Sequence, residues 1–147
     1  MALVLRLSMI GCLLLLTCLA MGDLSKNFSR HEFLCGCGCG LGTPSTELVT
    51  ALQELRNIIM HPIVINSSLR CSKYNYDVGG NENSQHLSGK AADISVEGVS
   101  LFDLLLAAYE VDAFFYGGIG VYEHHIHVDV RGYTARWTFD TKKNKPV

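Results

Sequence analysis

Hydrophobic residues in the first half of the chain follow a helical spacing and then an extended one. Four aliphatic residues recur every three or four positions, which predicts a helix packed on a core: Leu48, Leu52, Leu55 and Ile59. Thr43 is a suitable N-cap and Pro44 suits the first helical position. The His61-Pro62 pair ends the helix, and residues 63–65 then predict a short buried strand.

The second half alternates between polar loops and short apolar segments. Residues 66–85 are rich in Asn, Ser and Gly and predict a long ordered loop, which at this length is usually functional. Residues 91–95 predict a strand, and Ser100 is expected to cap a second helix with Asp103 as its capping-box partner. Residues 114–122 are interrupted by glycines and predict a strand or hairpin.

Two helices mixed with short strands predict an α+β domain, with a small antiparallel sheet and flanking helices. The chain has 147 residues, which suits one domain, and its hydrophobic content of 48% is enough to bury a core. Its formal net charge is −2, and no basic run precedes the tail, which argues against nucleic acid as a partner. We expect a monomer.

The first 22 residues have the pattern of a signal peptide. Arg6 is their only charge, an apolar stretch runs from Leu7 to Met21, and Ala20-Met21-Gly22 fits a small-x-small cleavage site. The stretch is short for a spanning helix, which needs about 20 residues, although an uncleaved membrane anchor is the alternative. We therefore expect residues 23–147 to form the mature domain, exported to the periplasm or the extracellular space.

The mature chain keeps four cysteines, three of which alternate with glycine: Cys35, Cys37, Cys39 and Cys71. Export implies an oxidising compartment in which disulfides can form, and four cysteines allow three full pairings. We expect one disulfide to Cys71. A structural metal held by the cluster is the second alternative, and free thiols are the third.

Residues 125–130 predict a strand with an unusual polar face. Side chains alternate between faces along a strand, so His125, His127 and Asp129 share one face. The aliphatic residues between them should face the core. Three ionisable side chains on a buried strand are costly unless they are paired or bound to something, which indicates a site.

Two further ligand candidates precede this strand. His86 lies at the end of the long loop, Asp93 lies in the following strand, and Gly89 allows the backbone to turn between them. Together with His127 they supply two imidazoles and one carboxylate. Three protein ligands and an open water position are typical of a catalytic zinc, whereas a structural zinc has four protein ligands, mostly cysteine.

The string Ser-x-His-x-x-Gly-x-Ala-x-Asp from Ser84 to Asp93, followed by the His-x-His at His125 and His127, resembles the D-alanyl-D-alanine carboxypeptidase family of zinc peptidases. That family includes phage endolysins and cell-wall endopeptidases, and it shares its metal-site fold with the amino-terminal signalling domain of hedgehog proteins. Similar segments extend over residues 27–137: Asn27-Phe28-Ser29, Ser67–Cys71 with Gly79-Gly80, Ile119–Tyr122 and Arg136-Trp137.

The resemblance implies roles for five residues. His86, Asp93 and His127 would bind zinc. Arg70 would bind the carboxylate of the substrate peptide, a task suited to its forked donors. Ser84 would contact the substrate or support the metal ligands. The implied reaction is hydrolysis in which zinc activates water and polarises the scissile carbonyl, while a side chain moves a proton to the leaving amine.

The residue that moves this proton is less clear from the sequence. Many members of the family carry Asp or Glu three residues before the last histidine ligand, where this chain has His124. The candidates are therefore Glu123, His125 and Asp129, and Glu123 shares the polar face only if the strand extends back to it. We favour Glu123 as the base and His125 as a site residue. Asp129 is alternatively a partner that orients a histidine.

These observations favour an exported zinc peptidase that cuts the stem peptides of peptidoglycan, as a DD- or LD-carboxypeptidase or endopeptidase. Two alternatives remain. One is a zinc-containing module that binds cell-wall peptides without turnover, as the hedgehog domains suggest. The other is a D-alanyl-D-alanine dipeptidase, an enzyme with a closed pocket.

Overall fold

The computed structural model describes residues 21–140 and 145–146. The signal-peptide prediction therefore falls almost entirely outside the described residues. Four α-helices and two short 3-10 helices are present in this part of the chain: η1 (Arg30–Phe33), α1 (Thr46–Ile59), α2 (Ser72–Asp77), η2 (Gln85–Ser88), α3 (Leu101–Tyr109) and α4 (Asp112–Phe115). The strands are β1 (Ile63–Ser67), β2 (Ala91–Val96), β3 (Gly118–Val121), β4 (Ile126–Asp129), β5 (Ala135–Asp140) and β6 (Lys145–Pro146).

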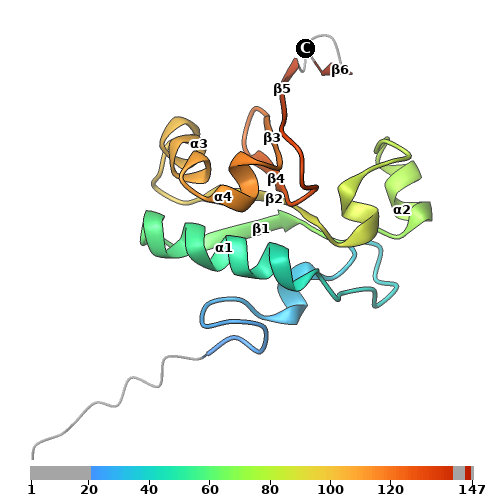
Figure 1. Cartoon of the computed structure of the whole chain (residues 1–147). Coiled ribbons are helices and arrows are strands. Elements are labelled where there is room, and N and C mark those ends of the chain that lie inside the picture. The colour runs from blue at the N-terminus through green and yellow to red at the C-terminus, as the bar shows by residue number, and fades with distance from the viewer. Residues whose placement is uncertain (1–20, 141–144, 147) are drawn as a thin grey trace, which may run out of the picture.

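The strands form one sheet in the order β1-β2-β4-β3-β5-β6 (Figure 1). Its neighbours are antiparallel except for β3 and β5, which run parallel. The α+β prediction is confirmed, but the sheet is mixed and not wholly antiparallel. The parallel pair arises because β5 returns to the free edge of β3 instead of pairing with β4, its predecessor in the chain.

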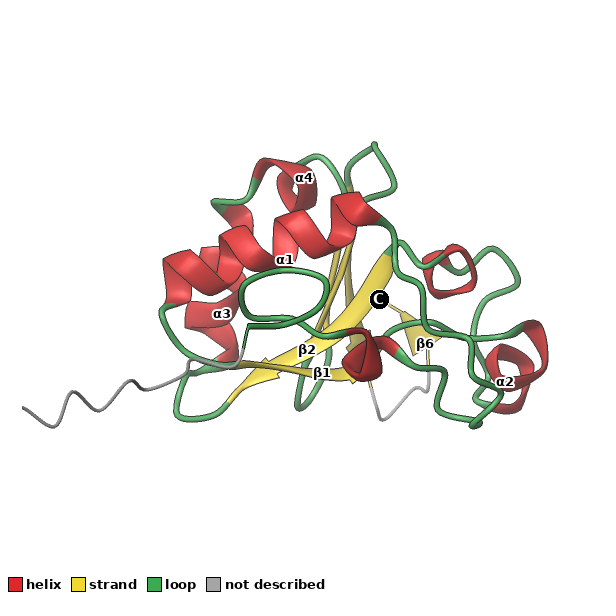
Figure 2. Cartoon of the chain, turned by 90° about the horizontal axis from the view of Figure 1, so that it is seen from below, coloured by secondary structure: helices red, strands yellow, loops and turns green. Residues whose placement is uncertain are grey.

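Helices α1, α3 and α4 gather on one face of the sheet, and α2 lies apart from them (Figure 2). Ile126, Val128 and Val130 belong to the core beneath these helices, as the alternation of β4 predicted. The opposite set on the same strand, His127 and Asp129, is buried as well. This second buried face, which carries ionisable groups, is where the site lies.

Helix α1 begins two residues later than its sequence indicated. Ser45 is the N-cap, and its hydroxyl accepts a hydrogen bond from the backbone N of Leu48. The predicted cap, Thr43, instead accepts a hydrogen bond from Nη1 of Arg30 over 2.9 Å. Ser45 thus caps the helix, while the Thr43 hydroxyl is engaged by a residue 13 positions earlier in the sequence. The second predicted cap is confirmed, because Ser100 accepts from the backbone N of Asp103 at the start of α3.

Two predicted segments contain helices that the sequence did not indicate. Residues 66–85 are not a continuous loop, because α2 begins after Cys71, whose sulfur accepts from the backbone N of Tyr74. Residues 114–122 are not a hairpin, because Phe114 belongs to α4 and is completely buried, and the strand begins only at Gly118. None of the helices in the described ranges is long and apolar enough to span a membrane.

Candidate metal centre

The sheet brings the predicted ligands together. Asp93 on β2 and His127 on β4 are directly opposite each other in the antiparallel register. His86 reaches them from η2, which ends at Gly89 with a φ of 68° just before β2 begins. A left-handed residue of this kind is readily supplied by glycine, so the predicted turn is confirmed. All three side chains belong to buried residues.

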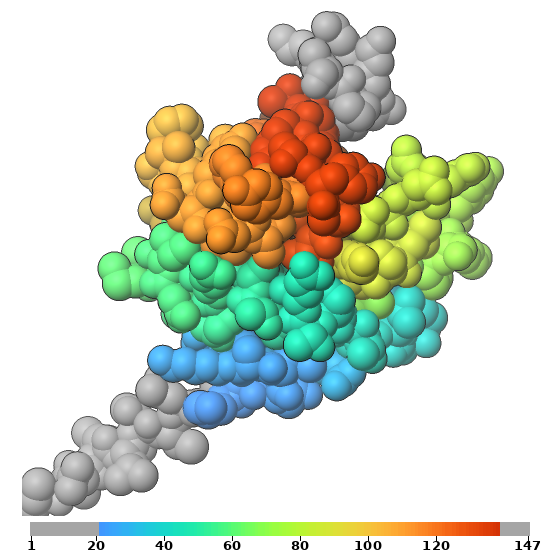
Figure 3. All heavy atoms as spheres, in the orientation of Figure 1, coloured from blue at the N-terminus to red at the C-terminus, as the bar shows by residue number. Residues whose placement is uncertain are grey.

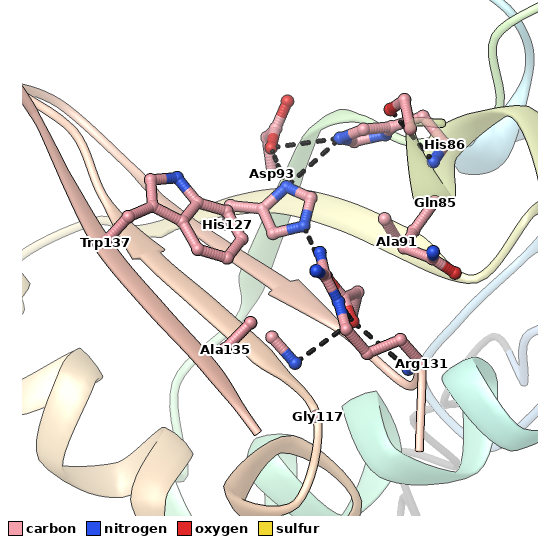
Figure 4. Close-up of polar contacts among 12 residues, drawn as sticks. Gln85, His86, Ala91, Asp93, Gly117, His127, Arg131, Ala135 and Trp137 are labelled. Carbon is pink, nitrogen blue, oxygen red and sulfur yellow. Dashed lines mark hydrogen bonds and ion pairs between the residues drawn. The ribbon is translucent and has the colours of Figure 1, made fainter. Parts of the chain in front are cut away.

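The three ligand atoms form a nearly equilateral triangle (Figure 4). Nε2 of His86 lies 3.2 Å from Nδ1 of His127 and 3.3 Å from Oδ1 of Asp93. Nδ1 of His127 lies 3.0 Å from the same carboxylate oxygen. Zinc with bonds of about 2.0–2.2 Å in tetrahedral geometry needs ligand atoms about 3.3–3.6 Å apart. The donor set and its spacing therefore fit zinc after small adjustments.

Each histidine donates its other ring nitrogen to a fixed acceptor. Nδ1 of His86 donates to the backbone carbonyl of Ser68 over 2.6 Å. Nε2 of His127 donates to Oδ2 of Asp129 over 3.0 Å. These acceptors determine the tautomers, so that an unprotonated nitrogen of each ring faces the centre of the triangle. The two rings are thus arranged as metal ligands and not as proton donors to each other.

Asp129 is fully buried, and every one of its contacts serves to hold it in place. Its Oδ1 accepts from the backbone N of Gly118, and both oxygens accept from the guanidinium of Arg131. Burial opposes its ionisation, but His127 and Arg131 outweigh burial and hold the pKa of Asp129 well below its usual range. Gly118 is required at its position, because a Cβ there would overlap the Asp129 carboxylate.

The charge of Asp93 is also compensated. Burial opposes its ionisation, yet its contacts with the rings of His127 and His86 hold the pKa of Asp93 well below its usual range. Its second oxygen accepts from Nη2 of Arg70 over 2.6 Å. Burial would lower the pKa of His127, but Asp129 and Asp93 outweigh burial and raise it. Asp93 and Asp129 are thus each paired with an arginine and held ionised, so that Asp93 can serve as an anionic metal ligand.

The triangle lies in an open cleft of about 1020 Å³. One wall comes from the segment around α2 and η2, and the other from the turn after β3 and from residues of the C-terminal part, including Arg131 and Trp137. Figure 3 shows the surface notched between the green-to-yellow segment and the red strands. A cleft of this size is large enough for a short peptide or a small-molecule ligand.

The family comparison agrees with this geometry. Residues 26–129 match the family described as Peptidase M15. The chain belongs to the M15 peptidase family. The family resemblance seen in the sequence is therefore confirmed, and the protein is a peptidase by membership. A comparison with curated protein sequences gave no match.

In this M15 peptidase the other predicted site residues have different surroundings. Arg70 lines the cleft, but its Nε donates to Ser67 and its Nη2 to Asp93. Ser84 also lines the cleft, and its hydroxyl accepts from the backbone N of His86, which caps η2. Both residues therefore support the ligands directly. Substrate contacts remain open to the Nη1 group of Arg70, for which the described residues provide no hydrogen-bond partner.

The three candidate bases are separated by the structure. Strand β4 begins at Ile126, so Glu123 lies in the exposed turn after β3, with His124 beside it, and does not line the cleft. His125 lines the cleft, and its ring stacks on Tyr122 with centroids 4.5 Å apart. Burial lowers the pKa of His125, against the opposing charge of Asp93. Asp129 contacts His127 from behind.

Sequence reasoning did not find Arg131, which holds Asp129. The signal was present, because Asp129 and Arg131 are two residues apart and alternate positions of an extended chain share a face. Trp137 was noted only through the family resemblance. Its ring lies 5.1 Å from that of His127, and it covers Gly120, where a Cβ would overlap the indole. Trp137 thus closes the side of the metal site.

Proposed function

We propose that this M15 peptidase is an exported zinc enzyme that hydrolyses the stem peptides of peptidoglycan. The observation that carries the proposal is the triangle of His86, Asp93 and His127. It combines the ligand number of a catalytic zinc with a solvent-accessible cleft on its open side. When bound, zinc would polarise the scissile carbonyl and activate a water molecule.

The residues of the chain supply what remains. His86 and His127 each present one lone pair, held in place by Ser68 and Asp129. His125 is our candidate for moving the proton from water to the leaving amine. His125 and His127 both line the cleft, whereas Glu123 does not. This assignment revises the preference that the sequence alone suggested.

Arg70 is our candidate for the group that recognises the carboxylate at the end of the substrate. Its guanidinium is fixed by Ser67 and Asp93 and lines the cleft beside the metal ligands. A fixed guanidinium binds a carboxylate with little loss of side-chain entropy. A carboxypeptidase that releases a terminal D-amino acid would use such a group, and an endopeptidase would not need it.

The shape of the cleft favours long substrates over dipeptides. A dipeptidase encloses its substrate, whereas this cleft has a volume of about 1020 Å³ and notches the surface between two walls. We therefore favour carboxypeptidase or endopeptidase action on stem peptides over a D-alanyl-D-alanine dipeptidase. Peptides of this kind lie outside the cytoplasmic membrane, which agrees with the proposed export.

One observation supports a second candidate, a zinc-containing module that binds cell-wall peptides without turnover. In the part of the chain that the structure describes, Asp93 is the one carboxylate that lines the cleft. If His125 cannot move the proton, no acidic side chain replaces it. Such a module would bind the same peptides through Arg70 and the metal but release them unchanged.

The test is to incubate the purified protein and zinc with defined muropeptides and to identify the products by mass spectrometry. Loss of one terminal residue would identify a carboxypeptidase, and scission within a cross-link an endopeptidase. Binding of the muropeptide by a zinc-loaded protein, without any cleavage, would favour the binding module. A matched control is the His127→Ala variant, which should show no products.

A further inference from the structure

A second group of potential metal ligands lies outside the proposed active site. It consists of Cys35, Cys37, Cys39 and Cys71, which we call the cysteine cluster. The first three lie in the loop after η1, and the fourth directly precedes α2. In Figures 1 and 3 the blue-green loop lies beneath the green-to-yellow segment that carries α2 and η2. Two segments far apart in the sequence therefore meet here.

The four sulfur atoms converge on one point. Sγ of Cys37 lies 3.4 Å from that of Cys35 and 3.6 Å from that of Cys71. All four ligand atoms lie within 4.8 Å of one another. A tetrahedral zinc with Zn–S bonds of about 2.3 Å needs sulfur atoms about 3.8 Å apart. The spacing fits a single ion. The sulfur of Cys37 lies close to those of both Cys35 and Cys71, whereas separate disulfides would place each sulfur next to one partner only.

The backbone of the loop is built to turn its cysteines inward. The backbone N of Cys35 donates to the carbonyl of Leu41 over 2.7 Å, which closes the loop on itself. Gly38 and Gly40 have φ values of 77° and 81°, in the left-handed region that glycine adopts without strain. The alternation of cysteine and glycine thus places successive sulfurs around one centre. Cys35 anchors the loop and is 3% exposed.

Backbone donors also point at the sulfurs. The backbone N of Cys71 donates to Sγ of Cys35 over 3.3 Å, and that of Tyr74 donates to Sγ of Cys71 over 3.4 Å. Hydrogen bonds of this kind favour the thiolate over the thiol, and the thiolate is the form that binds metal. They tie the loop to the start of α2 even before an ion is bound.

We propose that the cysteine cluster binds one structural zinc ion through all four thiolates. Soft sulfur ligands in tetrahedral arrangement favour zinc over the hard cations, and four protein ligands leave no position for substrate. The ion would fasten the loop of residues 35–41 to the corner that carries Arg70. This corner already contacts the active site, because the backbone N of Arg70 donates to the carbonyl of His86.

The disulfide to Cys71 that the sequence suggested is not formed, because all four cysteines are free in the structure. Cys37 and Cys39 are exposed. If the protein is exported, as the proposed function has it, exposed thiols would be oxidised unless something held them, and a zinc ion bound by the thiolates would protect them. The sequence could not show whether the cysteines pair in disulfides or gather around one point. In the structure all four sulfur atoms gather within 4.8 Å of one another.

The experiment measures zinc per chain in the full-length protein by elemental mass spectrometry, after loading with zinc and removal of unbound metal. The double variant His86→Ala/His127→Ala removes the proposed catalytic ion and leaves the cysteine cluster intact. We expect this variant to retain one zinc per chain. Adding Cys37→Ser and Cys39→Ser, two exposed positions, should remove it. With cobalt in place of zinc, the first variant should show thiolate-to-metal charge-transfer absorption and the second should not.

A variant with Cys39→His controls for misfolding, because histidine can replace one thiolate in a zinc site of three cysteines. In the His86→Ala/His127→Ala background, Cys39→His should hold more zinc than Cys39→Ser made alone in the same background. The proposal is overturned if the His86→Ala/His127→Ala variant holds no zinc, or if its intact mass shows the cysteines oxidised to disulfides. Because the catalytic ligands are absent from that variant, the outcome is independent of whether the protein is an active zinc peptidase.

Discussion

The Nε2 nitrogen of His127 donates to the carboxylate of Asp129, two residues further along strand β4, over 3.0 Å. Side chains two residues apart share one face of a strand, so this contact is built into the strand itself. Arg131 and the backbone of Gly118 hold the carboxylate from the other side. The result is a chain of contacts that fixes the orientation of His127 toward Asp93 and His86.

Replacing Asp129 by Asn should weaken metal binding without removing a ligand. An amide has only one oxygen, so it cannot accept hydrogen bonds from Arg131 on two oxygens as the carboxylate does. It would also leave the His127 ring less well oriented and a weaker ligand for the metal. We expect the zinc affinity to fall about 10- to 100-fold, the usual effect of losing such a partner. Competition with a chromophoric chelator measures it. The control is Asp77→Asn, which removes an exposed carboxylate paired with Lys73 and should leave the affinity unchanged.

Replacing Arg70 by Met should affect substrates according to their C-terminus. Losing a charge-assisted hydrogen bond, of about 1.5–3 kcal/mol, should raise KM about tenfold or more for peptides with a free carboxylate. The same peptides with an amidated C-terminus provide the control, and they should lose less activity, because they lose only the support that Arg70 gives to Asp93. An equal loss on both substrates would mean that Arg70 acts through Asp93 and not on the substrate.

The position of the proton-transfer group can be tested in three neighbouring residues. His125→Phe keeps a ring to stack on Tyr122 but cannot carry a proton, so kcat should fall about 10²- to 10⁴-fold while zinc content is retained. Glu123→Gln and His124→Phe change exposed side chains in the adjacent turn and should alter kcat less than threefold. A large loss in Glu123→Gln with normal activity in His125→Phe would reverse the assignment.

Zinc binding should weaken as the pH falls. The pKa of His127 is raised in the metal-free protein, so below that pKa its ring is protonated in the free state and must lose the proton to bind zinc. Protons and zinc therefore compete, and acid favours the free state. We expect the zinc affinity to decrease about tenfold per pH unit for each proton displaced, and to level off at higher pH. Calorimetry in buffers of different ionisation enthalpy should detect proton release, and no release at pH 6 would contradict this account.

The convergence of His86, Asp93 and His127 could be predicted because it depends on local rules. Alternation along β4 places His127 and Asp129 on one face and the aliphatic residues on the other. The turn at Gly89 brings His86 back to β2. Both patterns are properties of a few consecutive residues, and the family motif repeats them. For the same reason the sequence correctly indicated α3 with its cap at Ser100.

The remaining features depend on contacts between distant residues. Ser45 caps α1 in place of Thr43, whose hydroxyl accepts a hydrogen bond from Arg30. The parallel pairing of β3 and β5 depends on which sheet edge is free. Glu123, the base favoured from the sequence, would share the polar face only if β4 extended back to it. A tight turn closed by the hydrogen bond from the backbone N of Tyr122 to the carbonyl of His125 prevents this. No pattern within a short window contains such information.

The central claim is that His86, Asp93 and His127 hold a catalytic zinc ion. Its most direct test is the rate of muropeptide hydrolysis by metal-free protein, before and after zinc is added, in the wild type and in His127→Ala. We expect zinc to restore hydrolysis in the wild type and to leave the variant inactive. Full hydrolysis by the metal-free wild type, or restored hydrolysis in His127→Ala, would contradict the account.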